Sequence, residues 1–301
     1  MNFVLVVVTL GLGSIPLLTN IIRYRRSKRK RRSTSKPPQS EKLLRPPGYS
    51  LAERISERKD TLDDHILWSI LGGGVGVCSI IEGLLLLVIP TGQIVAGMLA
   101  LFTGIAGLAV SLHFARKVRI TREDIDKLHL GLRGEQAVGE MLTEAAEWGY
   151  RTYHDFMGDG PWNIDHVCVG ERGVFLIESK ARTKRTSTNP KLRDHEINVA
   201  GVALEFPTFT DTKSVNQALA NARWLAKYLR DETGDTVFVE PLLVFPGWWV
   251  TLVSKERPVL VLNTKQLLPY LWEQPAKLDP KLVIRIRTAL EKKCRTLEFW
   301  E

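Results

Sequence analysis

The sequence predicts an α/β domain preceded by about three transmembrane helices. Three long apolar segments occupy the first third of the chain, and the remainder alternates between short β-rich runs and amphipathic helical repeats. The two clearest strands have apolar residues on both faces, which suits a sheet covered by helices on two sides. From about residue 120 we therefore expect the order helix, three strands, helix, strand (αβββαβ, with additions), in a mixed sheet flanked by helices.

The first apolar segment, residues 1–22, has no charged side chain and is long enough to cross a bilayer. A cleaved signal peptide has positive charge before its apolar run, whereas here the charge follows: eight of the ten residues in Arg23–Arg32 are basic. The positive-inside rule places this basic cluster in the cytoplasm and the N-terminus outside. We also expect the cluster to contact anionic membrane lipids.

Residues 23–65 are interpreted as a basic cytosolic linker that ends in a short amphipathic stretch, and residues 66–115 as a transmembrane helical hairpin. Pro90-Thr91-Gly92-Gln93 separates its two apolar arms, and Arg116, Lys117 and Arg119 return the chain to the cytoplasm. Residues 120–301 then form a cytosolic domain. The expected location is the plasma (inner) membrane of a prokaryote.

Small residues at helical spacing allow two helices of the hairpin to approach closely. They are Gly72 and Gly76 in the first arm and Ala96, Ala100 and Gly104 in the second. Packing of the two arms against each other is the favoured interpretation, and homo-oligomerisation through the same faces stays open. Glu82 is expected to point into the helix bundle.

The amino-acid composition limits which kinds of function the chain can be expected to have. The formal net charge of +9 suggests a nucleic-acid binder, but residues 66–301 hold 28 Lys/Arg against 27 Asp/Glu, so the excess lies near the N-terminus. The three cysteines have no CxxC spacing. Neither a disulfide framework nor a zinc site is therefore expected.

The elements of the C-terminal domain follow from periodicity and turn signals. A helix begins near Thr121 and is interrupted by Gly131 and Gly134, and a stronger helix follows over Glu135–Trp148. The expected strands are Arg151–Asp155, Asn163–Val169, Val174–Lys180, Val237–Phe245 and Val259–Leu262. The later helices are expected over Val215–Arg230, Gln266–Trp272 and Lys281–Lys293, and residues 182–213 are interpreted as long, polar and irregular.

The second and third of these strands form a hairpin with an unusual set of charges. If Glu171 and Arg172 form its two-residue loop, Asp165 falls directly opposite Glu178, with Cβ atoms about 4.5–5.5 Å apart. Lys180 lies on the same face because strand side chains alternate. Unpaired buried charge is costly, and a shared divalent cation would explain these residues.

Two carboxylates and a neighbouring carbonyl, that of Ser179, offer the hard oxygen ligands that suit Mg²⁺ or Mn²⁺. Such a metal can polarise a phosphoryl oxygen and activate a bound water. Lys180 could orient that water or stabilise developing charge on phosphate. The predicted chemistry is metal-assisted hydrolysis of a phosphodiester bond, with Asp165 and Glu178 as metal ligands.

Four further residues have two interpretations each. Glu135 precedes Val138 by one helical turn, so its carboxylate either faces the sheet as a functional group or is a solvated residue at a helix start. Gln217 either serves the site or forms a capping box with Ser214, and capping is slightly favoured. Trp248 and Trp249 could stack on unpaired bases, although core packing is favoured. His166 alternates to the face opposite Asp165 and is interpreted as structural.

A run of basic residues leaves the proposed site directly after Lys180. No acidic residue lies between Glu178 and Asp194, and the basic residues beyond Lys180 are Arg182, Lys184, Arg185, Lys191 and Arg193. They could hold a phosphate backbone. A solvated flexible loop is the alternative, and the two remain evenly balanced.

Several strings resemble the nuclease-related domain, abbreviated NERD, which is assigned to the PD-(D/E)xK nuclease superfamily. They are Gly134-Glu135, Asn163-Ile164-Asp165-His166, Gly173-Val174-Phe175 and Glu178-Ser179-Lys180. The resemblance covers about residues 128–245 and implies a restriction-endonuclease-like αβββαβ core. It also implies that Asp165 and Glu178 ligate metal, that Lys180 is the catalytic lysine, and that Glu135 and Gln217 belong to the site. Ile164 departs from the proline of the superfamily name.

The expectation is therefore a membrane-anchored, Mg²⁺- or Mn²⁺-dependent nuclease that cleaves DNA or RNA on the cytosolic side. The alternative keeps the fold without catalysis, as a scaffold at the membrane that binds nucleic acid or a protein partner. The trio of Asp165, Glu178 and Lys180 favours the nuclease, because a pure binding module does not need it.

Overall fold

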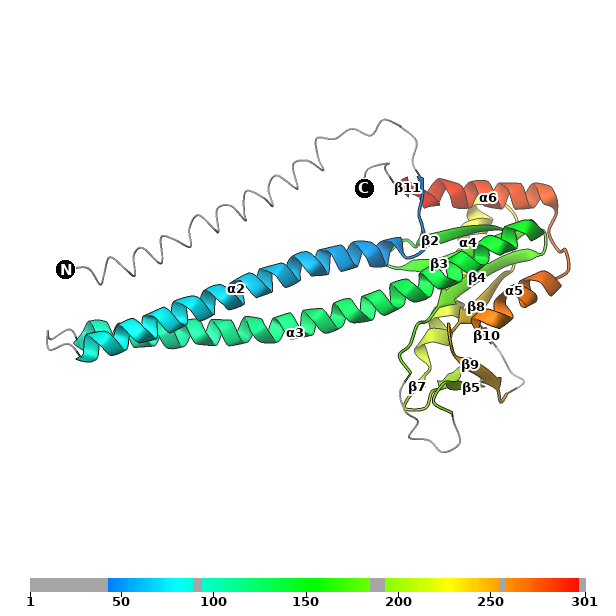
Figure 1. Cartoon of the computed structure of the whole chain (residues 1–301). Coiled ribbons are helices and arrows are strands. Elements are labelled where there is room, and N and C mark those ends of the chain that lie inside the picture. The colour runs from blue at the N-terminus through cyan, green and yellow to red at the C-terminus, as the bar shows by residue number, and fades with distance from the viewer. Residues whose placement is uncertain (1–42, 89–93, 185–192, 255–257, 298–301) are drawn as a thin grey trace. The chain divides into compact units, whose positions relative to one another are not determined.

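The computed structural model describes residues 43–88, 94–184, 193–254 and 258–297 (Figure 1). Within these residues the chain divides into two compact units, one helical (Ser56–Ile125) and one α/β (residues 43–55 and 126–297). The α/β unit thus includes a segment that precedes the helical unit in sequence. The predicted transmembrane segment 1–22 and the Arg23–Arg32 cluster lie outside the described residues.

The helical unit is built from parts of α2 (Tyr49–Val88) and α3 (Ile94–Glu144), which both extend beyond it. Each of these two helices contains a stretch long and apolar enough to cross a membrane. The end of the predicted linker 23–65, where a short amphipathic stretch was expected, is helical from Tyr49. The predicted interruption at Gly131 and Gly134 is also wrong, since α3 continues through both.

The two helices of this unit lie side by side (Figure 1), and glycines line their contact. A Cβ added to Gly76 would lie 3.0 Å from the carbonyl oxygen of Gly104, and one added to Gly83 would lie 2.9 Å from that of Gly97. The backbones therefore approach as closely as the small-residue pattern predicts. Ala96 of that pattern is exposed. Ser69 and Ser111 tie the pair, each hydroxyl donating to the other residue's carbonyl at 3.1 and 2.8 Å.

Outside that contact, the helical unit is covered by exposed apolar side chains. They include Trp68, Ile70, Val75, Val77, Ile81, Leu84, Val95, Met98, Leu99, Phe102, Ile105 and Leu112. A continuous apolar surface of this kind is unusual on a protein surrounded by water and typical of one that contacts lipid or another protein. Glu82 is half-buried among these residues.

The α/β unit is centred on a five-stranded mixed sheet with the strand order β10-β8-β4-β3-β2. The strands β2 (Arg151–Met157), β3 (Asn163–Gly170) and β4 (Gly173–Ser179) are antiparallel neighbours. The strands β8 (Val239–Val244) and β10 (Leu260–Leu262) add in parallel to β4. A mixed sheet and the predicted order helix, three strands, helix, strand are both observed.

Helices cover both faces of this sheet, as its two-sided apolar strands predict. On one face, α4 (Lys213–Thr233) and α6 (Pro280–Cys294) bury Leu225 and Ile286 against the sheet. On the other face, the end of α3 and α5 (Thr264–Glu273) bury Leu142 and Leu267. A short 3-10 helix, η1 (Ala145–Trp148), joins α3 to β2.

The interpretation of residues 182–213 as irregular is wrong for the last part of that range. It contains β5 (Glu196–Ala200), β6 (Ala203–Glu205) and β7 (Thr210–Asp211). Together with β9 (Trp249–Leu252) they form a second sheet in the order β7-β6-β5-β9. Its inner face packs on the start of α4 and the end of β8 through Ile197, Leu204, Val215, Leu243 and Phe245.

The segment before α2 docks on the α/β unit. Its short strand β1 (Leu43–Leu44) pairs with β11 (Arg295–Leu297), which follows α6. Gly48 has φ +73° and lies against the Leu132 side chain of α3. Glycine is favoured at this position because its backbone conformation strains residues with a Cβ.

Candidate functional site

The site lies where β3 begins and β4 ends. The β3–β4 ladder runs from Gly170↔Gly173 to His166↔Ile177, which is the register predicted from the two-residue loop. The next positions along the two strands are Asp165 and Glu178. Both side chains are buried, with 7% and 1% of their surface exposed, so the hairpin places two carboxylates together in the interior.

Glu178 is the centre of a hydrogen-bond network. Its Oε2 accepts from Lys180 Nζ at 3.2 Å and from Gln217 Nε2 at 3.4 Å. Its Oε1 accepts from Asn221 Nδ2 at 2.9 Å. Lys180 Nζ also donates to Gln217 Oε1 at 3.4 Å. The hairpin and α4 therefore hold the carboxylate, the lysine and the glutamine in mutual contact.

Asp165 accepts hydrogen bonds from the residue that follows Glu178. The Ser179 amide and hydroxyl donate to its Oδ2 at 2.8 and 3.1 Å. Burial and the neighbouring Glu178 carboxylate raise the pKa of Asp165 to about 7, although Lys180 and Ser179 act in the opposite direction. The Asp165 side chain therefore changes between its protonated and ionised forms near neutral pH.

Glu135 enters the site from α3. Gly134 allows this approach, because a Cβ there would lie 2.7 Å from the Ala181 Cβ. The Glu135 side chain is buried, and its Oε2 has no hydrogen-bond partner among the described residues. Burial, followed by the charges of Asp165, Asp155 and Glu178, raises its pKa to about 9. The structure therefore agrees with the interpretation in which the Glu135 carboxylate faces the sheet.

Lys180 remains a cation in this environment. Burial lowers its pKa, but the charges of Glu178 and Asp165 and the hydrogen bond to Glu178 outweigh that effect and hold the pKa above its usual value. The site therefore combines a permanent ammonium group with carboxylates that repel one another.

A further carboxylate, Asp155 on β2, was missed by the sequence analysis. It is fully buried and has φ +51°. Its Oδ1 accepts from Ser50 at 2.6 Å and Asn163 at 2.7 Å, and its Oδ2 lies 3.4 Å from the Arg45 guanidinium. Following the β2–β3 register, Asp155 is opposite Asp165. A single Asp at the end of a predicted strand gives no indication in the sequence that its carboxylate is buried beside the site.

Asn221 was also missed, although a signal exists. It follows Gln217 by four residues on α4, so both lie on one helix face, and a face with two amides is unusual beside buried apolar residues. The favoured capping role of Gln217 is wrong. Asp211 caps α4 instead, accepting from the amides of Lys213 and Ser214 at 2.9 and 3.1 Å.

The structure describes only some residues of the predicted basic loop. Arg182 pairs with Asp211 at 3.2 Å. Lys184 and Arg193 are exposed, and Arg185 and Lys191 lie outside the described residues. A cavity of about 450 Å³ opens where this loop begins, lined by Thr183 and by Asp126, Lys127, His129, Leu130 and Arg133 of α3.

His166 lies away from the acidic cluster and contacts another histidine. Its Nδ1 is 2.8 Å from the Nδ1 of His154, and the two rings meet edge to face. Burial lowers the pKa of both imidazoles, that of His154 to about 4, so both are neutral at physiological pH. A neutral, buried pair fits the structural role predicted for His166.

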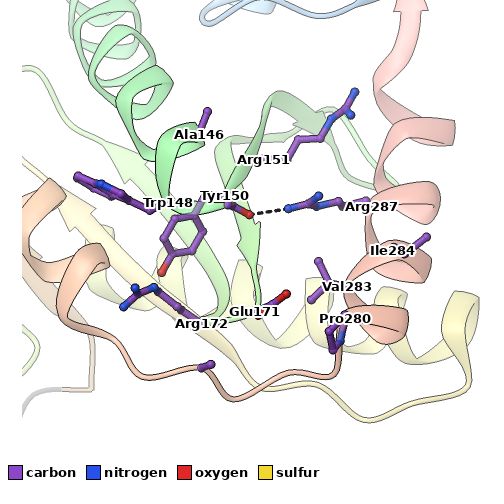
Figure 2. A pocket seen from close by; sticks show the side chains of 12 residues that line it. Ala146, Trp148, Tyr150, Arg151, Glu171, Arg172, Pro280, Val283, Ile284 and Arg287 are labelled. Atoms are coloured by element: carbon purple, nitrogen blue, oxygen red, sulfur yellow. Dashed lines mark hydrogen bonds between the residues drawn. The ribbon is translucent and has the colours of Figure 1, made fainter.

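A separate cavity of about 890 Å³ lies at the loop end of the hairpin (Figure 2). Its lining includes Tyr150, Glu171, Val283 and Arg287, and Arg287 donates to the Gly149 carbonyl at 2.6 Å. Figure 2 shows the Arg151 side chain directed away from Glu171. None of the predicted site residues lines this cavity, so it is distinct from the carboxylate site.

The donor set suits a hard divalent cation. The Glu178 carboxylate lies close enough to Asp165 and Glu135 to raise the pKa of both, and Glu135 has a buried oxygen without a partner among the described residues. Within the described residues, no group of three or more His, Cys, Asp or Glu side chains is arranged so that it could hold a metal ion. Mg²⁺ does not require one, because it commonly binds one or two carboxylates and retains several waters.

The α/β unit therefore gathers carboxylates, a lysine and a glutamine at one end of a mixed sheet. Residues 130–246 match the family model NERD, the nuclease-related domain, and this part of the chain is such a domain. The resemblance seen in the sequence strings is thereby confirmed. Neither a curated protein nor a solved structure matches the chain.

Proposed function

We propose that the α/β unit is a metal-dependent nuclease with a restriction-endonuclease-like core. The observation that carries the proposal is the cluster of Asp165, Glu178 and Lys180 within a nuclease-related domain. A module that only binds nucleic acid has no use for buried carboxylates whose repulsion raises their pKa. The order of elements and the antiparallel β2–β3–β4 unit, extended in parallel by β8, support the proposed core.

In this proposal, Asp165 and Glu178 hold Mg²⁺ or Mn²⁺ together with the Ser179 carbonyl, and Glu135 contributes from α3. The metal supplies charge neutralisation at the phosphate and a more acidic bound water. Lys180 stabilises the negative charge that develops on the phosphate or orients the attacking water. Gln217 and Asn221 keep Lys180 and Glu178 in place through the hydrogen bonds described above.

Phosphodiester hydrolysis adds water across the P–O bond. The water oxygen bonds to phosphorus, the bond to the leaving oxygen breaks, and the leaving oxygen receives a proton. A carboxyl with a raised pKa, such as Glu135, is able to exchange that proton near neutral pH.

The substrate is DNA or RNA, held by its phosphates. Lys184 and Arg193 are exposed basic residues of the segment that follows Lys180, and Lys127, His129 and Arg133 line the cavity beside Thr183. Arg182 belongs to the same basic run, as do Arg185 and Lys191, which lie outside the described residues. Such contacts are independent of base sequence.

The chain is also proposed to be an integral membrane protein, with the nuclease on the cytosolic side. The support is the apolar surface of the helical unit, the two helices able to span a bilayer, and the Arg23–Arg32 cluster. Membrane lipids would then contact the apolar surface of the helical unit. Self-association of the chain would use the same helix faces.

The test uses the full chain in detergent with end-labelled single- and double-stranded DNA and RNA. Cleavage is compared with Mg²⁺, with Mn²⁺ and with a chelator. The proposal expects cleavage that requires metal and is lost in Glu178→Gln. A folded protein that binds these nucleic acids but cleaves none with either metal would favour the scaffold instead.

A further inference from the structure

The end of β8 makes a turn that exposes one of two adjacent tryptophans. Val244, the last residue of β8, accepts the Lys180 amide at 2.9 Å, so this turn begins beside the proposed catalytic lysine. Trp248 N–H donates to the Phe245 carbonyl at 3.3 Å, and Gly247 has φ +77°. Proline followed by a glycine of positive φ, closed by this bond, is the pattern of a type II turn.

This turn gives the two tryptophans opposite environments. Trp248 is 4% exposed and packs edge-on against Phe206, and its Nε1 donates to the Arg182 carbonyl at 3.3 Å. Trp249 is 62% exposed. The core role favoured from the sequence therefore applies to Trp248 and does not apply to Trp249.

The Trp249 backbone is held firmly. Its N–H donates to the His195 carbonyl at 2.7 Å, and it pairs with Glu196 in the parallel β5–β9 ladder. The strand β9 is an edge of the second sheet, so one side of it is uncovered by other strands. An exposed indole on a fixed backbone presents a large flat surface at a low cost in conformational entropy.

Two exposed basic residues belong to the segments that adjoin Trp249. Lys184 lies along the turn, with its Nζ 3.9 Å from the position of a Cβ at Gly247. Arg193 immediately precedes the Asp194-His195 pair that adjoins Trp249, and it is exposed. Two acidic residues adjoin the same position: the exposed Asp194, and Glu196, which accepts the Thr251 hydroxyl at 2.7 Å. The combination of exposed aromatic ring and flanking cations fits a nucleic-acid strand with accessible bases.

We propose that Trp249 is a specificity-determining residue that stacks on an unpaired base, while Lys184 and Arg193 contact the adjoining phosphates. This inference rests on the proposed nuclease function and specifies its substrate class as nucleic acid with single-stranded character. In a duplex both faces of each base are already stacked on neighbouring pairs, so duplexes do not gain from this contact.

The binding test uses the full chain with Asp165→Asn to prevent cleavage, and follows the anisotropy of labelled single-stranded DNA, single-stranded RNA and matched duplexes. Adding Trp249→Ala is expected to raise the Kd for the single strands by about fivefold to a hundredfold, the range that base stacking on an aromatic residue supports. Trp249→Phe is expected to retain most of the affinity. Duplex binding should be unchanged.

Trp272→Ala is the matched control, because Trp272 is also half-exposed but packs on Arg172 at the far end of the hairpin. Cleavage by proteins with Asp165 intact separates the two proposals. If wild type cleaves while Trp249→Ala lowers neither single-strand affinity nor single-strand cleavage, the stacking role is wrong and the nuclease stands. Equal losses on single strands and duplexes would also overturn it. If wild type never cleaves, the anisotropy series still decides the role of Trp249.

Discussion

Asp165 and Glu178 repel each other at the end of the hairpin, and the surrounding donors relieve only part of that repulsion. Ser179, Lys180 and Asn221 donate to them, yet the pKa of Asp165 remains raised to about 7. Charges kept together against their own repulsion are common where function requires them. Stability and activity should therefore respond in opposite directions to their removal.

Replacement of Asp165 by asparagine tests this opposition. Asp165→Asn keeps an acceptor for Ser179 and removes a buried charge, so we expect the free energy of unfolding to rise by about 1 kcal/mol or more at alkaline pH. Cleavage should fall by about a hundredfold or more, because a proposed metal ligand is lost. Chemical denaturation and a cleavage assay measure the two effects. Asp231→Asn, at an exposed position of α4, is the control that should change neither.

The raised pKa values also predict how metal binding depends on pH. In the unfolded chain these carboxyls titrate near 4, but in the fold Asp165 titrates near 7 and Glu135 near 9. Without metal, their contribution to stability is therefore fully present below about pH 4 and is lost as the pH rises through the folded values. A metal cation binds the deprotonated carboxylates. The stabilisation that it gives must therefore grow as the pH rises through these pKa values.

The measurement is the rise in Tm on adding Mn²⁺ to the full chain at a series of pH values. We expect a small rise near pH 5 and a larger one near pH 8, and a much weaker pH dependence in Asp165→Asn. A rise that is equal at all pH values, or unchanged in the variant, would place the cation elsewhere.

At the scale of residues, the sequence was sufficient where spacing alone determines position. Counting from a two-residue loop placed Asp165 opposite Glu178, and the ladder has that register. Asp155 and Asn221 depend on tertiary contacts instead. The first is surrounded by Arg45 and Ser50 from a distant segment, and the second faces Glu178 only because α4 crosses the end of β4. No local pattern encodes such contacts.

The segment 43–50 is the element whose position could be tested most simply. Its Arg45 lies against the buried Asp155 carboxylate, with 14% of the Arg45 side chain exposed. Arg45→Ala should lower the free energy of unfolding of the α/β unit by about 1–3 kcal/mol, because a buried charge loses a donor. Denaturation of the double variant with Asp155→Asn should show a smaller loss than the two single losses added together.

Additivity of the two variants would mean that Arg45 and Asp155 do not interact. A chain shortened to begin near residue 120 would lack this segment and should be less stable for the same reason.

The proposed role of the basic loop predicts how nucleic-acid affinity depends on salt concentration. If Lys184 and Arg193 contact phosphates, replacing each by alanine should reduce the slope of log K against log salt by about 1, with a uniform loss of affinity across sequences. Anisotropy titrations at several salt concentrations measure this slope. Lys281→Ala, at an exposed position of α6, should leave it unchanged, and an unaltered slope in the loop variants would remove them from the interface.

At the scale of elements, strongly periodic helices and apolar strands were predicted within a few residues, as for α4, β3 and β4. The strands β5 to β7 were missed because they are short and polar on one side, and they are stabilised by packing on α4 and β8. Gly131 and Gly134 suggested a helix break. In the fold they allow close contact with Leu51 and Ala181, and tertiary packing outweighs their low helix propensity.

At the scale of the whole molecule, the apolar surface of the helical unit predicts how the protein fractionates. The full chain should remain with membranes after alkaline carbonate extraction. A tag at the C-terminus should be accessible to protease only in inside-out vesicles, since the positive-inside rule places the nuclease-related domain in the cytosol. Release by carbonate, or protection of the tag in such vesicles, would contradict the anchoring or the orientation respectively.

The account as a whole depends on the carboxylates and the lysine acting together in hydrolysis. The most direct measurement compares the full chain with Asp165→Ala and Lys180→Ala in metal-dependent cleavage of labelled nucleic acid, with Lys213→Ala as a control for an exposed lysine. The account predicts that cleavage requires metal, is lost in both site variants and persists in the control. Metal-dependent cleavage that survives both site variants would show that this cluster is not the catalytic centre.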